Sequence, residues 1–383
     1  MSKLTGVDPR AVYNDGKILT DSLGPDQKHD LLVFIGRFQP LHYGHMRVID
    51  IALTRAKQTL ILVGSANVGR TLYNTFTYQE RYAMIASQYQ EAIDDGRLVL
   101  RPLDDHTYAD ADWLEQVQDI VEHDVLKNKT AKTISLIGCE KDHTSYYLGL
   151  FPQWGNIGVE FKVPLNSTDV RKAVFLQKNS YNPGPGSGRI INEEYEFIHK
   201  ACPPEIARLL YAFTMRSEYE DIKEEWGFIN TYRNNRQKGN EYPVIDHTVD
   251  ACVVQSGHVL VVQRRWRPGK GLFALPGGFL NEFEPVDHAI LRELREETQI
   301  DVSDTVLRAG FVKREQFSDP RRSDRGRIIT ECGLFKLQDR AKLPTVKGAD
   351  DAACAFWLPL NKVDPSAFFE DHAFIIRKLT KDL

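Results

Sequence analysis

Short apolar runs alternate with amphipathic stretches between residues 31 and 175. Five apolar runs bounded by Gly, Pro or Asp have the character of buried strands: Leu31–Ile35, Leu60–Val63, Leu98–Leu100, Ile134–Ile137 and Val159–Val163. Three stretches between them have helical spacing: Gly44–Ala56, Thr77–Tyr89 and Asp112–Leu126. This alternation predicts an α/β, Rossmann-like domain with a parallel, doubly wound sheet and sites at the carboxyl ends of its strands.

The pattern changes in the second half of the chain. Residues 179–188 are turn-formers throughout, so they form either a linker or, as we favour, a loop that closes over the first site. A helical stretch, Pro204–Arg233, follows. From Asp246 onward, short strands (His247–Val254 and Val259–Gln263), one strong helix (Pro285–Thr298) and further strands up to Trp357 predict an α+β domain. We therefore expect an N-terminal extension, 1–30, a first domain, 31–178, a loop and helical linker, 179–240, and a second domain, 241–383.

Composition agrees with a globular protein of two domains. The chain has 383 residues, too many for one ordinary core, and 42% of them are hydrophobic. The formal net charge of −4 provides no basic surface for nucleic acid. The five cysteines are scattered, which indicates reduced thiols in the cytoplasm, and no apolar run approaches the roughly 20 residues that cross a bilayer. We expect a cytoplasmic protein that binds neither nucleic acid nor membrane.

A phosphate site is predicted where the first strand runs into a helix. Two imidazoles three residues apart, His42 and His45, can donate to one polyphosphate, and Arg37 adds a bidentate donor. Gly44 allows close backbone approach at a helix start, whose free N–H groups attract anions. The segment resembles the HxGH signature of the nucleotidylyltransferase superfamily, in the GRFQPxHxGH form of the archaeal-type nicotinamide mononucleotide (NMN) adenylyltransferases. The resemblance implies that Gly36, Phe38 and Gln39 also line the ATP phosphate site.

Further segments follow in the order of the same family. Ser167, Thr168 and Arg171 resemble its second signature, and hydroxyl caps with an arginine at a helix start make a second anion site. Residues 74–81 resemble another family element, with Thr75 where Pro is usual, and residues 138–148 resemble its nicotinamide-side loop. The resemblance implies a set of NMN-side residues, with Trp113 as a candidate stacking surface that could equally be core: Asn74, Thr77, Arg81, Trp113, Lys141 and Asp142.

The mechanism that this resemblance implies is direct in-line attack. The mononucleotide phosphate attacks the α-phosphorus of ATP and releases pyrophosphate, with His42, His45, Arg37 and Arg171 as catalytic residues. No side-chain nucleophile is required, and Mg²⁺ bridging the phosphates assists charge neutralisation.

A second constellation is an acidic helix. Glu293, Glu296 and Glu297 fall at i, i+3 and i+4, so three carboxylates share one arc and predict a site for Mg²⁺ or Mn²⁺. Pro285 suits a first helical position, and Arg292 can pair with Glu284. Residues 278–300 resemble the Nudix box, Gx5Ex7REUxEExGU, with Gln299 where the family has Gly. The resemblance implies metal ligation by Glu284, Glu293, Glu296 and Glu297, and catalysis by Glu296 and Glu297 through a water that attacks a diphosphate.

The flanks of the box suggest its substrate. They resemble Nudix domains that handle ADP-ribose, and arginines suit a ligand with two phosphates and two riboses. The residues expected on the ADP-ribose side are Arg264, Arg265, Gly278, Arg321, Arg325 and Arg327.

The leading hypothesis is therefore a bifunctional enzyme that uses ATP and NMN to make NAD, and that hydrolyses ADP-ribose to AMP and ribose 5-phosphate. One alternative is an adenylyltransferase whose Nudix domain only senses a nucleotide; a Nudix-type transcriptional regulator is weaker, since no basic recognition helix follows the box. Another keeps two enzymes but places pantetheine, riboflavin or sugar phosphates in the first site, and NADH or a dinucleoside polyphosphate in the second. A homo-oligomer is left open.

Overall fold

The computed structural model describes residues 16–127, 131, 133–139, 150–161, 165–176 and 193–383. Lys141, Asp142 and the turn-rich segment 179–188 lie outside the described residues. The chain forms two compact units: unit 1 holds Met1–Ala66, Tyr73–Asp105 and Asp110–Ile222, and unit 2 holds Asn67–Leu72, His106–Ala109 and Lys223–Leu383. Among the helices that the structure describes, none has the length and apolar character to cross a membrane.

Unit 1 contains a mostly parallel sheet in the order β1-β6-β5-β2-β3-β4. Its strands are β1 (Lys17–Asp21), β2 (His29–Gly36), β3 (Ala56–Val63), β4 (Leu98–Pro102), β5 (Ile134–Cys139) and β6 (Gly155–Glu160). Strands β2 to β6 pair in parallel, which confirms the sequence prediction, whereas β1 adds an antiparallel edge beside β6. The last strand was expected at Val159–Val163 and begins four residues earlier.

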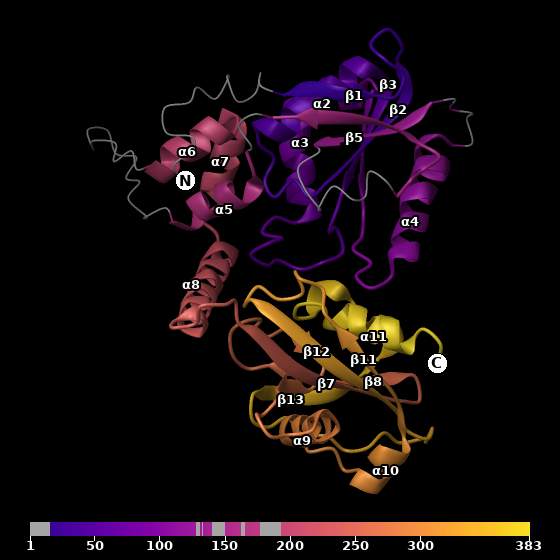
Figure 1. Cartoon of the computed structure of the whole chain (residues 1–383), viewed down its shortest axis with the longest axis vertical. Helices are drawn as coiled ribbons and strands as arrows, with labels where there is room; N and C mark the ends of the chain where they lie inside the picture. Colours follow the sequence, from indigo (N-terminus) through magenta and orange to yellow (C-terminus); the bar gives the residue numbers. More distant parts are fainter. Residues whose placement is uncertain (1–15, 128–130, 132, 140–149, 162–164, 177–192) are drawn as a thin grey trace. The chain divides into compact units, whose positions relative to one another are not determined.

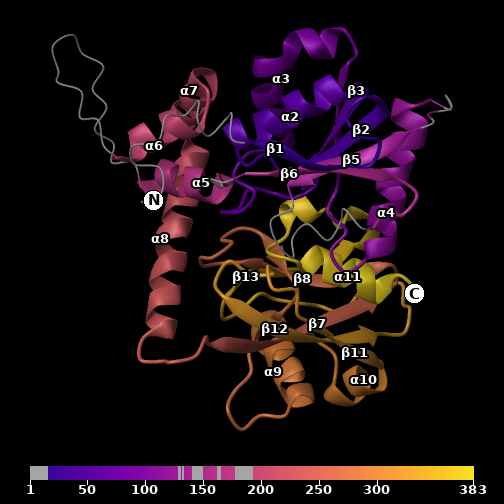
Figure 2. The ribbon, with the colours of Figure 1, turned by 45° about the horizontal axis from the view of Figure 1, so that its top comes forward.

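Helices cover both faces of this sheet. They are α2 (Tyr43–Arg55), α3 (Tyr78–Asp94), α4 (Asp110–Asp119) with the π-helical turn η1 (Ile120–Val125), and α5 (Ser167–Leu176). One face of the sheet carries Leu31, Leu60 and Leu62, and it is covered by Val117 of α4 and Val121 of η1. Helices α2 and α3 lie on the opposite face (Figure 2). The sheet is therefore doubly wound, with the ends of β2 and β3 between two helical layers.

Three helices follow the undescribed segment. They are α6 (Glu193–Ala201), α7 (Pro204–Phe213) and α8 (Ser217–Gln237), so the single stretch expected at Pro204–Arg233 is two helices. Helices α6 and α7 belong to unit 1, and α8 contributes to both units, because the boundary falls after Ile222.

Unit 2 is an α+β domain, as the sequence predicts. Its sheet has the order β11-β12-β7-β8-β13, with β10 beside β7 and β9 beside β8. The strands are β7 (Ile245–Gln255), β8 (His258–Arg264), β9 (Phe273–Ala274), β10 (Gly277–Phe279), β11 (Phe311–Phe317), β12 (Arg327–Lys336) and β13 (Ala352–Pro359). The helices are α9 (Val286–Thr298), α10 (Asp304–Ala309) and α11 (His372–Thr380), with short turns η3 (Leu360–Lys362) and η4 (Pro365–Ala367).

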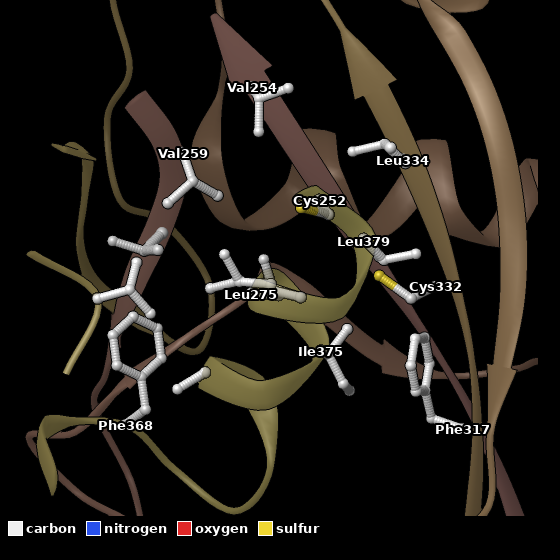
Figure 3. Close-up of a cluster of buried hydrophobic side chains, with 14 residues drawn as sticks. Cys252, Val254, Val259, Leu275, Phe317, Cys332, Leu334, Phe368, Ile375 and Leu379 are labelled. Atoms are coloured by element: carbon white, nitrogen blue, oxygen red, sulfur yellow. The ribbon is translucent and has the colours of Figure 1, made fainter. Parts of the chain in front are cut away.

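Alternation along β7 sends side chains to opposite faces of this sheet. Val249, Ala251 and Val253 pack against α9. Cys252 and Val254 pack against α11 on the other face, in a core that includes Ile375 and Leu379 (Figures 1 and 3). The acidic helix α9 is therefore anchored by its apolar arc, which leaves its carboxylates at the edge of the sheet.

Candidate active sites

The two histidines of unit 1 meet at the start of α2. His42 is the N-cap, and its Nδ1 accepts from the backbone N–H of His45 at 3.4 Å. The two rings stack with centroids 3.7 Å apart and planes 19° apart. A Cβ on Gly44 would lie only 3.1 Å from the His42 ring, so glycine is what lets the imidazole fold back over the helix start. The structure thus brings together the pair that the sequence predicts.

The second signature reaches the same turn. Ser167 Oγ donates to the Pro40 carbonyl at 3.1 Å, and Arg171 donates to the Gln39 carbonyl at 2.5 Å. Arg171 also donates to Thr168 Oγ1 at 3.3 Å. Two helix N-termini, those of α2 and α5, therefore converge on one loop, as expected for a polyphosphate site. Arg171 is buried, and its guanidinium holds the loop; its catalytic contact stays a prediction.

Gln39 and Phe38, expected at the ATP phosphates, and Asn74, expected on the NMN side, contribute to the packing of the loop. The Gln39 side chain is buried; it donates to Asn74 Oδ1 and the Phe76 carbonyl and accepts from the Phe76 N–H. Phe38 is also buried, with φ at +52°, and its ring packs 4.9 Å from that of His45. A Cβ on Gly36 would meet the Phe38 ring at 3.0 Å. We therefore describe Gln39, Asn74 and Phe38 as positioning residues. The amides of the first two hydrogen-bond inside the protein, and the Phe38 ring packs against His45.

Arg81 and Thr77 are also structural. Arg81 is fully buried, and its guanidinium donates to the carbonyls of Arg37, Gly64, Ser65 and Thr77. Burial lowers the pKa of Arg81 to about 10, so the group stays charged at neutral pH. Thr77 caps α3 in a reciprocal pair with Glu80. Both are expected on the NMN side; in the structure Arg81 joins the start of α3 to the ends of β2 and β3, and Thr77 caps α3.

Arg37 and Trp113 differ in accessibility. Arg37 is exposed, with its guanidinium carbon 5.7 Å from the centre of the Tyr73 ring, so it can reach a ligand. Trp113 is half-buried with its ring 6.1 Å from that of Phe151, which places it in the core cluster of unit 1. Of the two readings of Trp113, packing is the one that its contacts support.

In unit 2, two carboxylates of α9 are buried beside a glycine pair. Glu297 accepts from the Gly277 N–H at 3.0 Å, and a Cβ on Gly278 would lie 2.6 Å from the Glu293 carboxylate. Burial raises the pKa of Glu297 to about 8, and the nearby charge of Glu293 adds to the shift. Burial also raises the pKa of Glu293. These carboxylates lack sufficient positive charge around them, which is the condition that a bound cation relieves.

Arg292 supplies part of that charge. It donates to both oxygens of Glu284, at 2.8 and 2.9 Å, and to Glu293 and Glu296, at 2.6 and 3.0 Å. The predicted pairing with Glu284 is confirmed, but Glu284 is occupied by it, which argues against this residue as a metal ligand. Within the described ranges, no three His, Cys, Asp or Glu side chains are already gathered for a metal. The hard oxygens of Glu293, Glu296 and Glu297 nevertheless fit Mg²⁺ or Mn²⁺, which would compete with Arg292.

A cavity opens beside Glu297. The expected residues Arg264, Arg325 and Gly278 line it, together with Glu297. The remaining expected arginines do not. Arg265 donates to the Ala352 carbonyl, Arg327 donates to the Ser318 carbonyl, and Arg321 is exposed on a turn.

Sequence reasoning assigned no role to several lining residues, among them Arg322, Phe369, Glu370 and His372. The guanidinium carbon of Arg264 lies 4.2 Å from the centre of the Phe369 ring, and that of Arg325 lies 5.5 Å from it. Arg322 makes a bidentate, buried ion pair with Asp371 at 2.8 and 2.9 Å. Three of these residues follow the Nudix box by about 70 positions, in a segment with no motif, so only the fold could bring them to the site.

Comparisons with known proteins agree with both sites. A cytidylyltransferase-like family model matches residues 33–134, and a NUDIX domain model matches residues 246–382. The chain is 38% identical over 152 residues to the nicotinamide/nicotinic acid mononucleotide adenylyltransferase of Acinetobacter baylyi, covering 39% of this chain and 78% of that protein. It is 33% identical over 129 residues to the ADP-ribose pyrophosphatase of Methanocaldococcus jannaschii, covering 34% of this chain and 69% of that protein.

The following solved structure matches both units together. It is the bifunctional NMN adenylyltransferase/ADP-ribose pyrophosphatase of Francisella tularensis, complexed with AMP and a manganese ion. The match has a TM-score of 0.79 and 33% identity, and covers 92% of this chain and 99% of that one.

Proposed function

This chain belongs to the family of bifunctional NMN adenylyltransferase/ADP-ribose pyrophosphatases, and we propose that unit 1 joins NMN to ATP to give NAD and pyrophosphate while unit 2 hydrolyses ADP-ribose to AMP and ribose 5-phosphate. The observation that carries the first activity is the stacked pair His42–His45 at the start of α2. The observation that carries the second is the buried pair Glu293 and Glu297 beside an arginine-lined cavity.

In unit 1, catalysis rests on positioning and charge neutralisation. The helix starts of α2 and α5 direct N–H groups toward one loop, where the ATP phosphates bind. His45 and the exposed Arg37 donate to the phosphates as negative charge builds during attack at the α-phosphorus. Ser167, Arg171 and Gln39 fix the loop so that these donors are already in place.

In unit 2, arginines and carboxylates divide the work. Arg264 and Arg325 bind the diphosphate of ADP-ribose, and the guanidinium groups of both lie close to the Phe369 ring at the cavity wall. Glu293, Glu296 and Glu297 would hold a divalent cation, Mg²⁺ or Mn²⁺, which polarises the diphosphate and acidifies a bound water. The Francisella relative, crystallised with a manganese ion, supports the choice of a divalent metal.

The partners we propose are small molecules: ATP, NMN, NAD and ADP-ribose. Among the residues that the structure describes there is no disulfide, which fits the reducing cytoplasm that we propose as the location. The intact carboxylates of α9 favour hydrolysis over a purely sensing role for unit 2. The alternative substrates are riboflavin phosphate for unit 1 and NADH for unit 2, and the rates with them are to be compared with the rates with NMN and ADP-ribose.

The test is a pair of assays on the full chain with Mg²⁺ or Mn²⁺. One offers ATP with NMN, and the other offers ADP-ribose. His45→Ala is expected to lower NAD formation by about 10²–10³-fold, because a donor to the developing charge is lost, and to leave ADP-ribose hydrolysis unchanged. Glu297→Gln is expected to lower ADP-ribose hydrolysis and to leave NAD formation unchanged.

Matched controls are His123→Ala and Glu282→Gln, which alter exposed side chains of the same types in the same units. Each control should retain both activities. NAD formation that survives His45→Ala, or ADP-ribose hydrolysis that survives Glu297→Gln, would remove the corresponding half of the proposal.

A further inference from the structure

His372 begins α11 and lines the cavity of unit 2, although it lies 75 positions after the last carboxylate of the Nudix box. Its side chain is buried apart from this face. The Leu275 N–H donates to His372 Nδ1 at 3.1 Å, so Nδ1 is an acceptor and carries no proton. The proton of the neutral ring is therefore on Nε2. Nε2 has no acceptor among the residues that the structure describes.

The surroundings keep this ring neutral. Burial lowers the pKa of His372 well below its usual value, and the positive charges of Arg322, Arg264 and Arg325 lower it further. Asp250 Oδ1 lies 3.9 Å from Nδ1, but an ion pair would need a proton on Nδ1, where the Leu275 N–H already points. The carboxyl group of Asp371 is held by Arg322 instead. The ring therefore offers one uncharged, directional donor to the cavity.

The neighbours of His372 indicate which ligand group it meets. Phosphate oxygens are matched by the guanidinium groups of Arg264 and Arg325. A hydroxyl needs a donor and an acceptor, and the same cavity provides the His372 N–H together with the carboxylates of Asp250 and Glu370.

We propose that His372 is a specificity-determining residue of unit 2, whose Nε2–H donates to a ribose hydroxyl of the bound sugar nucleotide. This inference rests on the proposed function of unit 2 and assigns a role within it. A site built to hydrogen-bond a hydroxyl discriminates strongly against ligands that lack the group, because its buried donor is then left without a partner.

Two substitutions separate this role from a structural one. His372→Asn places an amide oxygen near the position of Nδ1, so the Leu275 N–H keeps an acceptor, while the donor at Nε2 is lost. His372→Gln places an amide nitrogen near the position of Nε2. Binding is measured on the full chain with a chelator present, so that no turnover occurs. The probes are ADP-ribose and inorganic pyrophosphate, and only the stabilisation of the unfolding transition of unit 2 is scored, because pyrophosphate is also a product of the reaction proposed for unit 1.

We expect His372→Asn to weaken ADP-ribose binding about tenfold, to leave pyrophosphate binding and the unfolding midpoint unchanged, and to be partly rescued by His372→Gln. Unchanged ADP-ribose binding in His372→Asn would overturn the proposal. Equal weakening for pyrophosphate would also overturn it, because the target would then be phosphate.

A second readout observes the wild-type ring itself. Nitrogen NMR of the wild-type imidazoles, with the His372 signal identified by its absence in a variant, should show a neutral ring protonated on Nε2. A proton on Nδ1 would contradict the inference. If wild-type protein fails to bind or hydrolyse ADP-ribose, the proposed function falls first; if it does both and His372→Asn is silent, only this inference falls.

Discussion

Gln299 ends α9 in the left-handed region, with φ 44° and ψ 38°. The Nudix box has glycine at this position, and glycine adopts this conformation without the crowding of a Cβ. We expect Gln299→Gly to raise the free energy of unfolding of unit 2 by about 0.5–1 kcal/mol, since left-handed strain is removed. Denaturant unfolding measures the change. Gln299→Ala keeps the Cβ and serves as the control, so equal stabilisation by alanine would show that strain is not the cause.

Single residues also show why a motif does not reveal which side chains face the ligand. Gln39 and Asn74 lie in segments that resemble binding loops, and their amides face each other in the interior. Buried polar groups must find partners, and a loop that cradles a ligand has many backbone groups to satisfy. The spacing of Gly44 and the two histidines did predict their juxtaposition, because a helix start fixes all three. In contrast, Arg322 lies in a loop without periodicity, so its burial depends on Asp371, far along the chain.

At the scale of elements, one buried side chain links the start of α3 to the sheet. Arg81 joins the helix to the carbonyl groups that end β2 and β3. We expect Arg81→Met to lower the free energy of unfolding of unit 1 by about 3–5 kcal/mol, because several buried carbonyls lose their donor. Arg97→Met, which removes an exposed ion pair with Asp95, should cost less than about 1 kcal/mol. If Arg81→Met instead left stability unchanged and raised only KM for NMN, Arg81 would be a ligand after all.

The elements that the sequence predicted best are those with strong apolar periodicity. Strand β2 and helices α2 and α9 agree with expectation to within a few residues, because each buries one continuous apolar stripe. Strand β1 was placed in an extension because most of its side chains are exposed, and its pairing with β6 depends on tertiary contact. The helix expected at Asp112–Leu126 changes to a π-helical turn at Ile120, which apolar spacing does not reveal.

At the scale of the molecule, the two units have separate hydrophobic cores, so we expect each unit to have its own free energy of unfolding. The core of unit 1 is built around Leu31 and Leu60, and the cores of unit 2 around Val249 and Cys252. Domains with their own cores unfold as units, and a ligand stabilises only the unit that binds it. NMN should therefore raise one calorimetric transition and ADP-ribose, with a chelator present, the other. Each ligand at about 100 times its Kd is expected to contribute about 2.7 kcal/mol. ATP is a poorer probe, because it shares its ADP portion with ADP-ribose.

His45→Ala and His372→Asn test the assignment of each ligand to its unit. The first should leave the ADP-ribose shift intact, and the second should leave the NMN shift intact. A single transition that both ligands raise together would mean that the chain unfolds as one unit and that the two sites are thermodynamically linked.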